Sequence, residues 1–150
     1  MENKGSKNLI ELLVRIPMFR HLVPLDCKKL LAICREISFA KGETIFDIGD
    51  PGTKLVIMLQ GAVSIQTASG KEFSRLEPAD TIGDMEIVSA QSRNARAVAL
   101  TSVSGMLIFR HDLQELFENE PVIGVKVLKN IVEALARKLV TANLKLESLE

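Results

Sequence analysis

The sequence predicts an α+β fold that is mainly β, with a barrel or sandwich of short strands between two helical regions. Residues 8–36 have helical periodicity, residues 38–110 form short alternating segments separated by turns, and the rest of the chain is helical again. A chain of 150 residues is long enough to bury the core of one domain. We therefore expect one domain over residues 1–150, with a helical lead-in (1–37), a β region and C-terminal helices (111–150).

Charge and hydropathy argue against several classes of protein. The 19 basic and 19 acidic residues balance, so no overall charge favours nucleic acid. Glu11 interrupts the first apolar segment, which lacks the continuous apolar region of a secretory signal. No stretch approaches the roughly 20 apolar residues of a membrane-spanning helix. We expect a cytoplasmic protein that binds neither a membrane nor DNA directly.

The N-terminal helical region is broken at Pro17 and Pro24, and Pro24 begins a helix with Leu30 on its buried face. Cys27 and Cys34 are expected on this helix. Two turns would separate their Cα atoms by about 10 Å, which is beyond disulfide reach. The two histidines of the chain are too few and too distant to complete a metal site. We interpret both cysteines as half-buried helix residues and expect no metal.

Turn sequences divide the central region into short segments with the alternating pattern of strands. The turns are GDPG at 49–52, Gly61, ASGK at 68–71 and EPAD at 77–80. Short strands at such close spacing indicate a barrel or sandwich. The alternating segments are 43–48, 54–59, 62–67, 71–76, 95–100 and 105–110.

The C-terminal helix has two apolar faces. One face consists of Ile123, Val127 and Ile131, which can pack on the strands. The other is a heptad seam, and because packing on one domain needs a single apolar stripe, the seam predicts a parallel homodimer through residues 122–149. The alternative is one wide core face. The seam contains Val125, Leu128, Val132, Leu135, Leu139, Ala142, Leu146 and Leu149.

The segment IGDMEIVSAQSRNARAV, residues 82–98, combines a glycine, an acid and an arginine. A helical turn over residues 84–89 would present free N–H groups to an anion that approaches Gly83. The planar fork of Arg93 suits phosphate oxygens, and Asp84 suits sugar hydroxyls. Together they predict a sugar-phosphate site. Taken singly, the acid could be a helix cap, the arginine a solvated cation and the glycine a turn residue.

Two segments at this separation resemble the cyclic nucleotide-binding domain family, of the catabolite activator and protein kinase regulatory subunit type. They are KGETIFDIGDPGTKLVIMLQGAVSI at 41–65 and the segment at 82–98, which resembles the phosphate-binding cassette of the family. IPMFRHLVPLDCKKLLA at 16–32 resembles its helical lead-in, and the last helix resembles its hinge helix. The resemblance implies an eight-stranded jelly-roll (double-stranded β-helix) barrel around a 3′,5′-cyclic nucleotide.

The resemblance also implies roles for single residues. Gly83 stands where a backbone N–H meets the phosphate or ribose, and Asp84 stands where a glutamate usually binds the ribose 2′-hydroxyl. Met85 and Glu86 stand where backbone amides meet the phosphate. Arg93 stands where an arginine pairs with the cyclic phosphate. The apolar positions that line the pocket are Ile65, Phe73, Leu76 and Ile82.

Five residues depart from the family pattern. Asp84 is one methylene shorter than glutamate, and Glu86 replaces a small residue, which is harmless if its side chain points outward. Ser92 replaces a frequent proline, and Asn94 replaces a small or hydroxyl residue and can donate to phosphate through its amide. Arg96 must face outward or join the site. These changes lower the expected affinity and leave a weakened or non-binding relative as the alternative.

The identity of the base is predicted from the last helix. Aligning residues 134–147 with bacterial activators places Ala142 and Asn143 where a hydroxyl pair often meets adenine, and asparagine can bond an adenine edge. This favours cyclic AMP over cyclic GMP. The alternative is that Asn143 is a polar flank of a coiled coil.

We expect a non-catalytic sensor module without a cofactor, because the chain has no plausible nucleophile–base pair, metal cluster or Walker-type loop. Ligand binding at 83–94 would shift the hinge at 111–125 and the dimer helix. The signal would pass to an unidentified downstream protein, unless the chain is a nucleotide sink or part of a longer protein. The alternative function is a dimeric interaction module with a degenerate pocket that binds no ligand.

Overall fold

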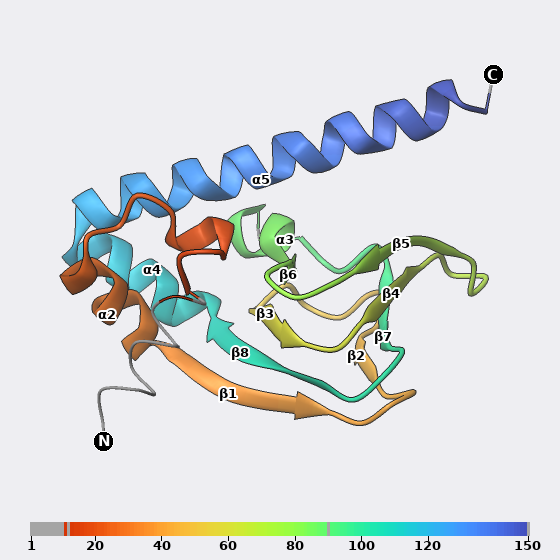
Figure 1. Cartoon of the computed structure of the whole chain (residues 1–150), viewed down its shortest axis with the longest axis horizontal. Helices are drawn as coiled ribbons and strands as arrows, with labels where there is room; N and C mark the ends of the chain where they lie inside the picture. Colours follow the sequence, from red (N-terminus) through yellow and green to blue (C-terminus); the bar gives the residue numbers. More distant parts are fainter. Residues whose placement is uncertain (1–10, 12, 90, 150) are drawn as a thin grey trace.

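The computed structural model describes residue 11, residues 13–89 and residues 91–149. Two antiparallel four-stranded sheets lie beneath one long helix that crosses the whole molecule (Figure 1). The predicted mainly-β jelly roll with N-terminal helices and a long C-terminal helix is therefore confirmed, although the eight strands form two sheets and not a closed barrel. Residues 8–10 of the predicted N-terminal helical region lie outside the described residues.

The strands pair across the sequence and not only with their neighbours. The first sheet has the order β1 (Cys34–Phe39), β8 (Val103–Phe109), β3 (Lys54–Gln60), β6 (Thr81–Ile82). The second has the order β2 (Thr44–Phe46), β7 (Arg96–Ala99), β4 (Val63–Gln66), β5 (Glu72–Leu76).

Strand β3 is buried on both faces because it lies between two cores. Leu55 and Ile57 point to a core shared with the helices, and Val56 and Met58 point to a core between the two sheets. The alternation follows from the two-residue period of a strand. The first sheet is therefore the middle layer of the domain.

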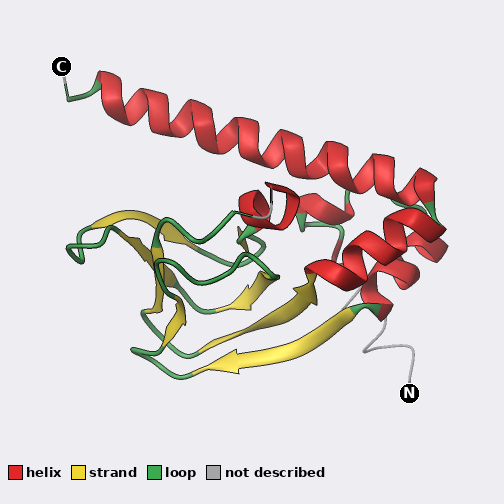
Figure 2. Cartoon of the chain, turned by 180° about the vertical axis from the view of Figure 1, so that it is seen from behind, coloured by secondary structure: helices red, strands yellow, loops and turns green. Residues whose placement is uncertain are grey.

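The helices are η1 (Pro17–Phe19), α2 (Pro24–Ala32), α3 (Asp84–Ser89), α4 (Arg110–Asn119) and α5 (Pro121–Glu147). Helices α2 and α4 lie at one end of the sheets around the beginning of the long helix, and α3 lies beneath its middle (Figure 1 and Figure 2). Among the described residues, none of these helices combines the length and the apolar character that a membrane crossing requires.

The prediction that Cys34 lies on the same helix as Cys27 is wrong. Helix α2 ends at Ala32, and Cys34 begins β1, where it is paired with Ile108 of β8. Strand pairing over the whole length of β1 overrides the local helical pattern. Both thiols are free, and burial raises the pKa of the Cys34 thiol to about 12.

Helix α5 packs on the domain through the face that the sequence predicts. Ile123, Val127 and Ile131 are buried in the core shared with the helices. The buried Asn130 side chain donates to the backbone carbonyls of Met18 and Arg20 at 2.9 Å and 2.8 Å, and so fixes the beginning of α5 to the lead-in. Most of the heptad seam lies on another face and is exposed to solvent: Val125, Leu128, Val132, Leu139 and Leu146, with Leu135 partly buried.

Candidate functional site

The cassette begins with a glycine that the geometry requires. Strand β6 ends at Ile82, Gly83 has a positive φ of 92°, and α3 begins at Asp84. A side chain at Gly83 would be strained by this backbone conformation, and its Cβ would collide with the guanidinium of Arg93. The predicted helical turn over residues 84–89 is confirmed, and Gly83 brings its first turn against the arginine.

The start of α3 contains backbone N–H groups without partners inside the helix. Ile87 is the first residue whose N–H bonds back within the turn, to the carbonyl oxygen of Gly83 at 3.1 Å. The N–H groups of Asp84, Met85 and Glu86 come before it, in the part of a helix where no intrahelical acceptor is available. These are the amides that the sequence assigns to a phosphate.

A loop from the other predicted family segment holds the backbone of Arg93 in place. The Arg93 N–H donates to the carbonyl of Asp50 at 2.9 Å, and the Arg93 carbonyl accepts from the N–H of Gly49 at 2.9 Å. The glycine-rich turn at 49–52 and the cassette are therefore one unit in space. This explains why the site needs both segments.

The side chain of Arg93 is buried, so the solvated-cation alternative is excluded. Its Nη2 donates to the backbone carbonyl of Lys54, and its Cζ lies 4.0 Å from the ring centroid of Phe46. Its Nε is buried without a hydrogen-bond partner among the described residues. The guanidinium therefore has a fixed position, with its charge held inside the protein against Gly83.

The counter-charge of Arg93 comes from within the cassette. Nη1 of Arg93 donates to Oε2 of Glu86 at 2.9 Å, and the two side chains are only 3% and 12% exposed. The Glu86 side chain therefore points into the site. It would leave ligand binding unaffected only if it pointed outward. The physical reason is that a buried guanidinium is costly without an anion, and Glu86 supplies one from α3.

Asp84 is buried as well, and it joins the cassette to the long helix. Lys138 of α5 donates to its Oδ2 at 2.8 Å and to its Oδ1 at 3.0 Å. The hydroxyl of Thr81 donates to Oδ2 at 3.2 Å, and Lys138 also donates to the Thr81 carbonyl at 3.3 Å. Both oxygens of the expected sugar contact are therefore engaged by protein donors.

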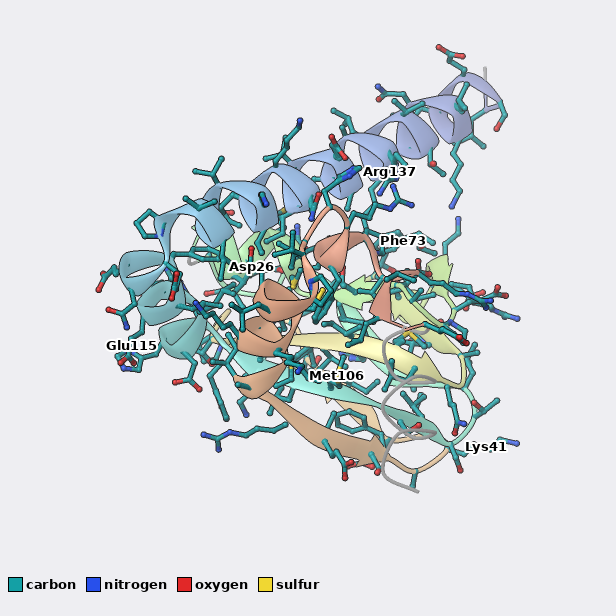
Figure 3. The ribbon with its side chains drawn as sticks, turned by 60° about the vertical axis from the view of Figure 1, so that its left-hand side comes forward. Asp26, Lys41, Phe73, Met106, Glu115 and Arg137 are labelled. Carbon is teal, nitrogen blue, oxygen red and sulfur yellow. The ribbon has the colours of Figure 1, made fainter. Side chains whose placement is uncertain are left out.

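The predicted apolar lining is split between the core and the surface. Ile82 is buried, and Ile65 and Leu76 pack against the core between the sheets. Phe73 is half exposed on β5, at the edge of the sheet beneath α5 (Figure 3). Lys145 of α5 donates to the Phe73 carbonyl at 3.0 Å and connects the helix to the second sheet.

The remaining predicted residues lie on the surface. Met85, Asn94 and Asn143 are exposed. Arg96 donates through Nε to Oδ1 of Asp47 at 2.9 Å. Arg96 therefore faces outward toward β2 and takes no part in the buried cluster around Arg93.

Four groups that hold the site were not predicted from the sequence: Phe46, Thr81, Lys138 and the Lys54 carbonyl. Lys138 is 54 positions from Asp84, so no local pattern connects the two. A signal for the partner of Arg93 was available in Glu86, an acid at a position where a small residue is frequent in the family.

Among residues 11, 13–89 and 91–149, no three His, Cys, Asp or Glu side chains are grouped so that they could hold a metal ion.

Comparison with known proteins decides the family. A sequence profile described as the cyclic nucleotide-binding domain matches residues 36–120, which is more than half of the chain. The chain belongs to the cyclic nucleotide-binding domain family. The match includes both loops that surround Arg93.

Curated relatives combine this domain with further sequence. The chain is 28% identical over 131 residues to a CRP-like cAMP-activated global transcriptional regulator of Mycobacterium tuberculosis, covering 85% of this chain and 58% of the regulator. It is 28% identical to the cyclic AMP receptor protein of Thermus thermophilus, covering 89% and 62%. A cyclic nucleotide-gated potassium channel of Mesorhizobium japonicum is 28% identical, covering 82% and 34%. The chain thus spans from about a third to three fifths of these relatives.

Solved structures agree with this assignment. The catabolite activator protein of Thermus thermophilus is 29% identical, with a TM-score of 0.75 over 89% of this chain and 62% of that chain. A cyclic nucleotide-binding domain from Methylobacillus flagellatus has a TM-score of 0.86 over 98% of this chain and 85% of that chain. At 20% identity, this second likeness concerns the fold alone.

Proposed function

We propose that this cyclic nucleotide-binding domain is a cytoplasmic sensor module that binds cyclic AMP in preference to cyclic GMP and relays binding to α5. The observation that carries the proposal is the bond between the cassette and the long helix. Asp84, the residue proposed to bind the ribose, is held by Lys138 of α5. A ligand that binds Asp84 therefore changes a contact that holds α5.

In this proposal the cyclic phosphate binds Arg93, Gly83 and the amides of Met85 and Glu86, and Asn94 donates from the rim. Asp84 accepts from the ribose 2′-hydroxyl. The buried guanidinium and the first turn of α3 support this placement, because both supply donors to an anion at Gly83. The base lies along the apolar positions Ile65, Phe73, Leu76 and Ile82, with Asn143 on its edge.

The relay follows from competition for one carboxylate. A ribose hydroxyl and Lys138 both need the oxygens of Asp84, so ligand binding weakens the contact between α3 and α5. A ligand shifts a conformational equilibrium only through contacts that differ between the two states, and this contact differs. Movement of α5 relative to the sheets then passes the signal to a downstream protein.

The preference for cyclic AMP is supported by the names of two relatives. The regulator of Mycobacterium tuberculosis is named as cAMP-activated, and the protein of Thermus thermophilus as a cyclic AMP receptor. Each is 28% identical to this chain.

The proposal is tested by thermal melts with cyclic AMP and with cyclic GMP. Binding to the folded state stabilises a protein in proportion to the logarithm of the ligand concentration, so the midpoint should rise steadily with cyclic AMP. It should rise less with cyclic GMP. Purified protein that absorbs in excess at 260 nm would indicate a nucleotide retained from the cell. A midpoint that stays constant with both ligands, on protein free of nucleotide, would reject the proposal.

A second function is favoured by the pairing of Arg93 with Glu86. If this carboxylate keeps the anion position permanently, the pocket binds no ligand and the chain acts as a dimeric protein-interaction module. Constant melting midpoints together with a dimeric mass would support this alternative.

We propose a homodimer for either function, through the exposed seam of α5. The occupant of this face is a second copy of the chain, because a heptad seam is complementary to itself and the buried face of the helix is already used by the domain. The seam residues proposed for the interface are the exposed Val125, Leu128, Val132, Leu139 and Leu146 and the partly buried Leu135.

A matched pair of variants tests the dimer. Leu139 and Leu144 are 61% and 60% exposed on the same helix, but only Leu139 lies in the seam. Leu139→Asp should convert the dimer to a monomer in light scattering at micromolar concentration, and Leu144→Asp should leave the mass unchanged. A monomeric parent protein would contradict the dimer.

A further inference from the structure

The anion position of the cassette is already filled by an acid from the same chain. Glu86 accepts from Nη1 of Arg93 at 2.9 Å, and Arg93 forms no other ion pair among the described residues. A carboxylate and a phosphate present the same kind of anionic oxygen to a guanidinium. Glu86 therefore holds Arg93 in the way a ligand phosphate would hold it.

The other sides of the guanidinium leave an incoming phosphate little choice of edge. Nη2 is bound to the Lys54 carbonyl, one face lies on the ring of Phe46, and Gly83 packs against the group. Nε has no partner among the described residues, but it is buried and not open to solvent. A phosphate that binds at Nη1 meets the carboxylate of Glu86. The phosphate and the Glu86 carboxylate would then lie side by side at Nη1 in a buried site. Their negative charges repel strongly there, so the two groups cannot both remain.

The charges of the cassette are balanced without a ligand. Arg93 is neutralised by Glu86, and Asp84 is neutralised by Lys138. A cyclic phosphate adds one negative charge to this balanced cluster. Movement of Glu86 into solvent restores the balance, because its charge is then hydrated and the phosphate takes its place.

We propose that Glu86 is a built-in competitor that must leave Arg93 before a cyclic phosphate can bind. This inference rests on the proposed function and adds the regulation of the same site. Glu86 sets the affinity of the pocket, and it makes entry of the ligand conditional on a rearrangement of the cassette.

The position of the Glu86 stem shows what this rearrangement involves. A Cβ placed on Gly52 would collide with the Cβ of Glu86 and with the backbone oxygen of Gln91. The stem thus fits closely against the turn at 49–52, and release of its carboxylate disturbs the contact between this turn and α3. Asp84 lies on the same helical turn and holds Lys138, so the displacement reaches α5.

The test is calorimetric titration of cyclic AMP into the parent, Glu86→Gln and Glu86→Ala. Loss of a charged hydrogen-bond partner that competes for Arg93 should tighten binding about 10- to 100-fold. Glu86→Gln keeps the shape and an oxygen acceptor for Nη1, which protects the fold if Glu86→Ala is unstable. Melts without ligand establish that each variant is folded.

The matched control is Glu115→Gln. It makes the same change of one charge on α4, outside the cassette, at the labelled Glu115 in Figure 3, whose side chain is 62% exposed. Its affinity for cyclic AMP should equal that of the parent.

The outcomes separate the two proposals. Tighter binding by both Glu86 variants supports the competitor, and binding by a variant when the parent shows none supports it most strongly. A parent that binds while the folded Glu86→Gln binds equally or more weakly overturns the competitor and leaves the sensor function standing. Absence of binding by the parent and by every folded variant overturns both.

Discussion

The two ion pairs of the cassette differ in burial and in the segments that they connect. Arg93 and Glu86 are 3% and 12% exposed, and both belong to the cassette. Asp84 is 7% exposed, but its partner Lys138 is 44% exposed and belongs to α5. The inner pair therefore fixes the anion position, and the outer pair fixes the long helix over it. Variants of each pair test this division of roles, and an ion pair on the surface provides the comparison.

The largest effect is expected when the inner pair is broken from its basic side. Arg93→Ala should abolish detectable binding of cyclic AMP in calorimetry, because the phosphate loses its counter-charge. The structure also predicts a loss of folding stability, which the sequence did not indicate. A buried carboxylate left without its partner destabilises a protein by about 3–5 kcal/mol, and denaturant unfolding should show a loss of this order.

The double variant Arg93→Ala/Glu86→Ala separates stability from binding. Removal of both charges leaves no unpaired buried ion, so part of the lost stability should return while binding stays absent. If Arg93→Ala binds cyclic AMP as tightly as the parent, Arg93 does not bind the cyclic phosphate and the proposed site is wrong.

An intermediate effect is expected from the outer pair, and it should differ in sign between the two partners. Lys138→Met frees Asp84 for the ribose and should tighten binding of cyclic AMP. Asp84→Asn removes the charged acceptor and should weaken binding about 10-fold. Calorimetry on both variants measures this. If Asp84 serves only to hold α5, the two variants will instead shift the affinity in the same direction.

Of these two variants, Asp84→Asn should affect stability much less than Arg93→Ala, because the Lys138 that it leaves unpaired is 44% exposed and keeps its hydration. Lys138→Met leaves the buried Asp84 carboxylate with the Thr81 hydroxyl as its side-chain donor, and should therefore cost more stability than Asp84→Asn. Hydrogen exchange should nevertheless become faster in the distal part of α5 in both, because each variant removes the contact with α3. Unchanged exchange would show that Lys145 and the core contacts suffice to hold the helix.

The smallest effect is expected from the surface pair of Asp47 and Arg96. The hydrogen bond from Arg96, with a further one from the Ile48 N–H, holds the pKa of the Asp47 carboxyl below its usual 3.8. A lowered pKa stabilises the fold above the unfolded-state value, and this contribution is lost as the pH falls through the folded-state pKa. Asp47→Asn should therefore melt slightly below the parent at pH 7. The difference should vanish in acid, and a difference that grows in acid would contradict this assignment.

Local features of the chain were predictable because their causes are local. The turn over residues 84–89 follows from a glycine before an amphipathic turn, and the buried face of Ile123, Val127 and Ile131 follows from helical periodicity. The strand segments follow from alternation between glycine-containing turns. Cys34 shows the limit, because its pattern continues a helix while its pairing with β8 makes it a strand residue.

The partners of the site residues were not predictable, since they depend on how distant segments meet. The sequence identified Arg93 and Asp84, but it did not indicate which groups would neutralise them. Lys138 reaches Asp84 because α5 is fixed at its beginning by core packing and by Asn130, and then runs over α3. Lys138 and Asp84 thus come from two helices, and the residues lie 54 positions apart in the sequence.

By itself, the sequence determined the fold class, the cassette and the cation at its centre, because residue type and spacing carry that information directly. Only the tertiary structure decided that both charged positions are already occupied, by Glu86 and by Lys138. Burial is the physical reason. A charge removed from water must find a partner inside the protein, and which partner it finds depends on the packing of all the segments around it.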